Sequence, residues 1–159
     1  MDQVPQTPIT SYRLAFIKAR WHSEIVDQCQ LAFVEQLQKQ ANIEYQVDVF
    51  DVAGAFEIPL LAKKLAEKGL YDAITASAFV VDGGIYRHDF VADAVIKGIM
   101  DVQIETGVPI FSAVLTPHSF HECEEHKTFF YDHFKLKGRE VADACSSLLE
   151  LMDAFEKVA

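Results

Sequence analysis

The chain has few cysteines, no long apolar run and fewer basic than acidic residues. Cys29, Cys123 and Cys145 are scattered and odd in number, so they predict no disulfide framework. No segment approaches the roughly 20 apolar residues of a membrane span, and residues 1–10 lack the apolar core of a signal peptide. The net charge of −10 argues against DNA or RNA as a partner. We therefore expect a cytoplasmic protein that acts on small molecules.

Half of the residues are hydrophobic, and they alternate between strand-like and helix-like patterns. Strands are predicted over residues 13–19, 45–52, 73–81 and 110–115. Helices are predicted over 22–40, 57–68, 89–106, 119–133 and 139–157, with a break around 135–138. This alternation predicts an α/β fold, a three-layer sandwich with a four-stranded parallel sheet flanked by helices. We expect a flexible N-terminal segment, 1–12, and a single domain, 13–159. Spare apolar faces, such as 151–155, predict contacts between subunits.

The segment Ala-Gly-Ala-Phe-Glu-Ile-Pro at 53–59 follows a predicted strand and opens a predicted helix. Gly54 allows close approach to the backbone, and the free N–H groups of a helix start favour polar or anionic ligand atoms. Glu57 and Pro59 suit the first helical turn. The segment is typical either of a well-capped loop or of a loop that binds a ligand.

Two other strand ends carry unusual residues, and parallel strands gather their carboxyl ends at one edge of the sheet. Trp21, beside His22, would be a platform for a planar ring or a partly buried core residue. In residues 82–89 a glycine pair leaves backbone N–H groups for a phosphate. Arg87 there can bind an anion and His88 can transfer protons. The simpler interpretation is a solvated helix start.

Four of the six histidines lie between 118 and 133, and the five-residue spacing of His121 and His126 falls in the range of zinc ligands. Cys123 lies between them, but a helix would place it on a different face from His126. We therefore favour a polar helix face or the rim of a substrate site over a metal centre.

Taken together, these motifs resemble the lumazine synthase family over most of the chain. The matching pieces are Trp21, the 54–59 run, Asp89-Phe-Val91, Val114-Leu-Thr116 and Leu136-Lys-Gly138. Trp21 and the histidine-rich residues 116–122 resemble the divergent type II branch known from rhizobia and Brucella relatives.

The resemblance implies a transferase that condenses 5-amino-6-ribitylaminouracil with 3,4-dihydroxy-2-butanone 4-phosphate to 6,7-dimethyl-8-ribityllumazine, the penultimate step of riboflavin biosynthesis. It implies a flavodoxin-like fold, no cofactor, no metal, and a homo-oligomer that is a pentamer or a decamer of two pentamers. Riboflavin would be a further ligand. The catalytic residues would be Arg87 and His88. The substrate-binding residues would be Trp21, His22, Gly54, Ala55, Phe56, Glu57, Phe79, Val80, Val81, Gly84, Ile85, Ser112, His126 and Lys137.

The chain departs from the family at the groups that handle phosphate and protons. The usual catalytic histidine of the family falls on Arg87, and its phosphate-binding arginine falls on His126. Ile85 and Tyr86 replace a threonine pair. These changes leave open a second function, a flavin- or lumazine-binding protein with low or no turnover. An FMN electron carrier is disfavoured, because residues 18–23 lack the Ser/Thr-rich phosphate loop of flavodoxins.

Overall fold

The computed structural model describes residues 9–158 and confirms the predicted alternation of strands and helices. The first half contains β1 (Thr10–Ala19), α1 (Ser23–Gln38), β2 (Ile43–Val52), a 3₁₀ turn (Ala55–Glu57) and α2 (Ile58–Glu67). The second half contains β3 (Ala73–Phe79), α3 (His88–Thr106), β4 (Ile110–Leu115) and α4 (Glu124–Glu156). Residues 10–12 belong to β1, whereas residues 1–8 of the expected N-terminal segment lie outside the described residues.

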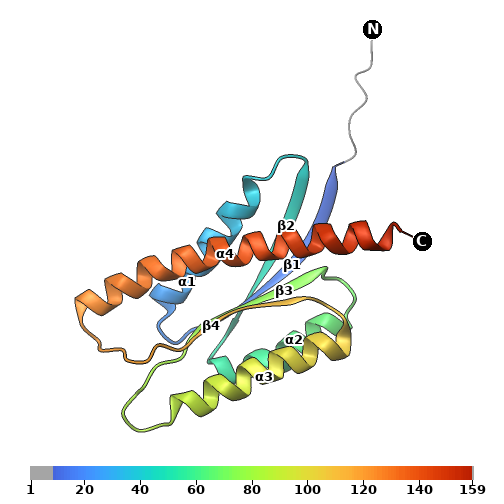
Figure 1. Ribbon diagram of the computed structural model, residues 1–159. Coiled ribbons are helices and arrows are strands. Elements are labelled where there is room, and N and C mark those ends of the chain that lie inside the picture. The colour runs from blue at the N-terminus through green and yellow to red at the C-terminus, as the bar shows by residue number, and fades with distance from the viewer. Residues whose placement is uncertain (1–8, 159) are drawn as a thin grey trace.

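The four strands form a parallel sheet in the order β2-β1-β3-β4, as predicted. All seven residues of β3 are buried, as expected for a parallel strand covered on both faces. Helices α1 and α4 cover one face, and α2 and α3 cover the other (Figure 1). Because β2 and β3 lie on opposite sides of β1, the chain changes direction in the sheet between β1 and β3. A crevice at such a point is where open α/β sheets bind ligands.

The face covered by α1 and α4 holds the largest buried side chains, including Phe16, Phe33, Phe79 and Phe134. Ile25, Cys29, Phe33 and Leu37 are spaced four apart in the sequence, which predicts that they share one face of a helix, and all four are buried on α1. Cys29 and Cys145 lie in this core, where burial raises the pKa of the two thiols to about 11 and about 12. Both thiols therefore stay protonated at neutral pH and act as packing groups.

The predicted break at 135–138 is wrong: α4 runs without interruption from Glu124 to Glu156. The helix also begins five residues later than the predicted start at 119. Gly138 lies inside the helix because α4 passes very close to α1 there. A Cβ on Gly138 would overlap the backbone carbonyl oxygen of Cys29 and lie 2.9 Å from Cβ of Ala32. The glycine thus permits close helix packing and does not end the helix.

Among residues 9–158, no helix has both the length and the apolar character that a bilayer crossing requires.

Candidate functional site

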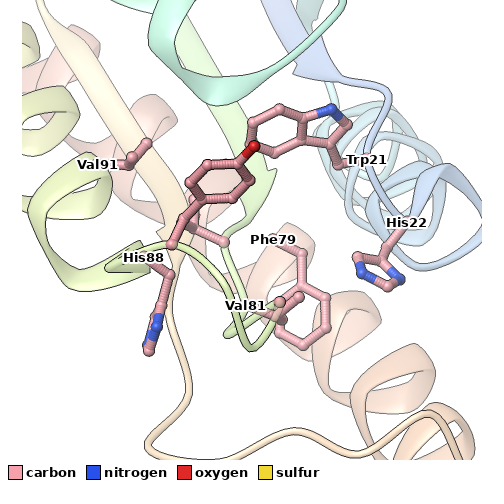
Figure 2. A pocket seen from close by; sticks show the side chains of 9 residues that line it. Trp21, His22, Phe79, Val81, His88 and Val91 are labelled. Carbon is pink, nitrogen blue, oxygen red and sulfur yellow. The ribbon is translucent and has the colours of Figure 1, made fainter.

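A pocket of about 540 Å³ opens at the carboxyl ends of β1 and β3, where the sheet changes direction. Its volume is in the range of small-molecule sites. In Figure 2, Trp21 and His22 approach it from the segment after β1, whereas His88 and Val91 lie across from them at the start of α3. The lining residues are Trp21, His22, Phe79, Val80, Val81, Gly83, Tyr86, His88 and Val91.

Trp21 is held in place by the second of the three predicted loops. A Cβ on Gly54 would lie only 2.9 Å from Cζ2 of the Trp21 indole, so the ring packs directly against the glycine backbone. The indole remains 53% exposed and borders the pocket. Gly54 is thus required by the close approach of a side chain from the neighbouring strand end, and the ring is left available to a ligand.

Glu57 organises the same loop. Its Oε2 accepts a hydrogen bond of 3.0 Å from the Gly54 N–H, so the carboxylate caps the turn that precedes α2. Gly54 and Ala55 are buried, whereas Phe56 and Glu57 are exposed. The segment is thus a well-capped loop whose Glu57 side chain remains accessible from solvent.

In the loop after β3, one of the backbone N–H groups expected to bind an anion is hydrogen-bonded within the loop itself. Gly84 has a φ of 77°, in the left-handed region that glycine adopts readily. Its N–H donates a hydrogen bond of 2.8 Å to Oδ1 of Asp82. The Gly84 N–H that the sequence offered to a phosphate is thus satisfied by a neighbouring carboxylate, and a phosphate would have to displace it. Ile85 is 83% exposed beside it.

A tight turn decides which way residues 86–88 face. Arg87 has φ −78° and ψ 86°. The His88 N–H donates a hydrogen bond of 3.0 Å to the Tyr86 carbonyl oxygen, so residues 86–88 form an inverse γ-turn. Tyr86 and His88 both border the pocket, whereas Arg87 does not.

Arg87 instead contacts its own helix. Its guanidinium donates to both carboxylate oxygens of Asp89, at 3.2 Å and 3.0 Å, and lies 4.3 Å from the ring centre of Phe90. The hydrogen bonds from Arg87 hold the pKa of the Asp89 carboxyl below its usual range. Because the Arg87 side chain is 69% exposed, this is a surface ion pair, a kind that contributes little to stability.

His22 joins the pocket to an aromatic cluster. It has a φ of 52° directly before α1, and its carbonyl oxygen accepts the N–H groups of Ile25 and Val26. Its ring meets Phe79 and Phe120 edge-on, at centroid distances of 5.7 Å and 5.2 Å. The predicted residues His22, Phe79, Val80 and Val81 therefore do lie together in the pocket.

Nine of the fourteen predicted substrate-binding residues do not line the pocket. Six of them are residues 54–57 and the pair Gly84 and Ile85, in the two loops described above, and the other three lie on β4 and α4. Ser112 is exposed on β4, at the edge of the sheet. His126 Nδ1 accepts a hydrogen bond of 3.1 Å from the His121 N–H. Lys137 pairs with Glu140 of its own helix at 2.7 Å. Within residues 9–158 no group of three or more His, Cys, Asp or Glu side chains is placed to hold a metal ion.

The predicted site residues omit three residues that line the pocket, Gly83, Tyr86 and Val91, although Gly83 belongs to the glycine pair that the sequence analysis associates with phosphate. Val91 is three positions after His88 on α3, so helical spacing places both on one face. Tyr86 was detectable only as one of two residues that replace a threonine pair, and the γ-turn that directs it into the pocket has no clear sequence pattern.

Comparison with known proteins assigns the chain to a family. Residues 11–153 match the family model described as 6,7-dimethyl-8-ribityllumazine synthase. The chain belongs to the lumazine synthase family. It is 53% identical to 6,7-dimethyl-8-ribityllumazine synthase 2 of Pseudomonas syringae pv. tomato, over 92% of this chain and 86% of that protein. It is 55% identical to the protein of the same name from Bradyrhizobium diazoefficiens, over 86% of this chain and 82% of that protein. It is 51% identical to 6,7-dimethyl-8-ribityllumazine synthase of Rhodococcus erythropolis, over 92% of this chain and 95% of that protein.

Trp21 provides a direct spectroscopic test of the pocket in this member of the lumazine synthase family, because it is the sole tryptophan. Riboflavin bound against the indole is expected to quench its fluorescence. Trp21→Ala is expected to weaken riboflavin binding by about 1–3 kcal/mol, the range for base–aromatic stacking. Calorimetric titration measures the loss independently of fluorescence. Unchanged fluorescence of the wild-type protein at saturating riboflavin would exclude the platform role.

Proposed function

We propose that the pocket between β1, β3 and α3 is where the chain condenses 5-amino-6-ribitylaminouracil with 3,4-dihydroxy-2-butanone 4-phosphate to 6,7-dimethyl-8-ribityllumazine. Family membership supports the reaction, which is the penultimate step of riboflavin biosynthesis. The observation that carries its placement is the exposed indole of Trp21, seated on Gly54 in the same pocket as His88. A flat ring surface and a proton-transfer group are the two things this condensation needs side by side.

The ribitylaminouracil would bind with its ring on Trp21. Stacking on an aromatic face suits a planar pyrimidine, and Phe79 and Val80 give the pocket an apolar floor. The ribityl chain would extend along the adjoining loop. There the backbone of Ala55 and Phe56 and the carboxylate of Glu57 would bind its hydroxyl groups. Glu57 is exposed and lies in the loop that Trp21 touches, which favours this direction for the chain.

His88 would transfer protons. The amine and the ketone form a Schiff base with loss of water, phosphate leaves, and the ribityl-bearing nitrogen then closes the second ring on the remaining carbonyl carbon with loss of a second water, so protons must move at nitrogen and oxygen. A histidine suits this near neutral pH, and His88 borders the pocket while Arg87 faces out.

Arg87 would hold the phosphate once its surface ion pair with Asp89 opens, together with backbone N–H groups of Gly84 and Ile85. Arginine remains protonated throughout the working pH range. His126 would assist only in its protonated form, which requires its Nδ1 to give up the hydrogen bond from His121.

Ser112, His126 and Lys137 would complete the pocket of a neighbouring subunit, in a pentamer or a dimer of pentamers. Two points support this: these residues lie outside the pocket of their own chain, and the family resemblance implies a substrate-binding role for them. Large apolar side chains on α3 are also exposed: Ile96 is 45% exposed, Met100 is 53% exposed and Ile104 is 76% exposed. Such a surface is typical of a subunit interface.

The protein is therefore expected to be an oligomer at low micromolar concentration. Light scattering of the purified chain measures its mass directly. A stable monomer of 17.9 kDa would overturn both the interface and the shared site.

Turnover separates the enzyme from the alternative, a flavin- or lumazine-binding protein. The purified chain is mixed with both substrates, and lumazine is followed by its absorbance, with either substrate omitted as a control. Lumazine formation that depends on both substrates supports the proposed reaction. Tight riboflavin binding without turnover would support the binding protein instead.

A further inference from the structure

We propose that Tyr86 is a substrate-positioning residue, the second aromatic wall of the ring site opposite the Trp21 loop. This rests on the proposed function, because it takes the ligand to be a planar nitrogen heterocycle such as the pyrimidine or the lumazine. The contact would be made by the phenol ring of Tyr86 and not by its hydroxyl group.

The first support is where the backbone sends the side chain. Tyr86 lines the pocket together with His88, on either side of the tight turn centred on Arg87. That turn lies between β3 and α3, whereas Trp21 belongs to the segment between β1 and α1. The two rings therefore border the same pocket from two different strand ends.

The second support is the surface that each aromatic side chain offers. Phe79 is only 1% exposed, because it packs among Phe120, Phe130 and Phe134. Trp21 and Tyr86 are 53% and 77% exposed. Among the Phe, Tyr and Trp residues that line this pocket, these two rings thus provide nearly all of the surface open to a ligand.

The third support is that other side chains lining the pocket are already packed against the protein, whereas Tyr86 is not. Gly54 fixes the Trp21 ring from behind, and Val80 is buried beneath the pocket. Tyr86 has no comparable burial, so a bound ring would cover a side chain that otherwise meets water. Covering an exposed aromatic ring is favourable in itself, which gives the ligand affinity and a fixed orientation.

The test compares Tyr86→Phe, which keeps the ring, with Tyr86→Ala, which removes it. Riboflavin is titrated against Trp21 fluorescence, and the KM of each substrate is measured. Tyr86→Ala is expected to raise the riboflavin Kd and the KM for ribitylaminouracil by about 5- to 150-fold, as for loss of one stacking contact. The KM for the butanone phosphate should change little. Tyr86→Phe should stay within about threefold of wild type.

Phe129→Ala is the matched control, because Phe129 is also exposed, at 61%, but stacks on His133 of α4 and does not line this pocket. Circular dichroism checks that each variant is folded. A folded Tyr86→Ala variant with wild-type riboflavin affinity would overturn the proposal. So would an equal loss in Tyr86→Phe, which would assign the contact to the hydroxyl group.

The two proposals can fail separately. A wild-type protein that binds riboflavin but forms no lumazine would refute the proposed function, while the Kd values of the Tyr86 variants would still decide the role of the ring. Normal turnover with no effect of Tyr86→Ala on Kd or KM would refute the role of Tyr86 alone. A wild-type protein that binds neither riboflavin nor ribitylaminouracil would overturn both.

Discussion

His88→Ala is expected to lower kcat by on the order of 10²-fold or more, the typical contribution of a general acid–base group. The physical reason is access: the turn at Arg87 brings His88 to the pocket and leaves Arg87 facing Asp89 and Phe90. Steady-state kinetics with both substrates measures the effect. His88→Gln is the companion variant, since it retains a side-chain hydrogen-bond donor but cannot carry a proton at neutral pH.

Arg87→Ala provides the contrast within the same turn. If Arg87 binds phosphate equally in the ground state and the transition state, its loss raises the KM for the butanone phosphate more than it lowers kcat. The division of roles would be refuted by a His88→Ala enzyme with normal turnover beside an Arg87→Ala enzyme with no kcat at saturating phosphate substrate. That result would return proton transfer to the position where the family usually has its histidine.

Gly138→Ala is expected to destabilise the protein by about 3 kcal/mol, at the upper end of overpacking effects. The added methyl group would overlap the carbonyl oxygen of Cys29, a backbone atom that cannot move without shifting α1 against α4. Helix propensity alone predicts the opposite sign, a gain of about 1 kcal/mol for alanine over glycine. Urea unfolding at fixed protein concentration gives the difference in the free energy of unfolding.

Arg139→Ala is the control for this experiment, because Arg139 is the next residue of α4 and is exposed. Its change in unfolding free energy is expected to lie within about 0.5 kcal/mol, as for most surface substitutions. If Gly138→Ala were as stable as wild type or more stable, the close contact between the two helices would be wrong, and with it the explanation of the uninterrupted helix.

Local patterns in the sequence predicted the order of the strands and helices and the parallel sheet, although not the uninterrupted course of α4. The four-residue spacing of Ile25, Cys29, Phe33 and Leu37 predicted the buried face of α1, because a helix returns to the same side every 3.6 residues. The apolar run of residues 73–81 predicted a strand, and all seven residues of β3 are buried, as in a parallel strand covered on both faces. Since parallel strands end at one edge, the sequence also predicted that the Trp21 loop, the Gly54 loop and the loop after β3 would meet. Gly54 and Trp21 do touch, and the loop after β3 lines the pocket with Trp21.

The tertiary structure decided what depends on distances between elements. Gly138 is read from the sequence as a helix break, because only the separation of α1 and α4 shows that a side chain has no room there. Arg87 and His88 are adjacent polar residues in the sequence, and only the backbone angles of the turn between β3 and α3 send one outward and the other to the pocket. Tyr86 joins the site for the same reason. Sequence patterns record which residues suit an element, whereas the direction of a loop side chain is fixed by the turn and the strands on either side of it.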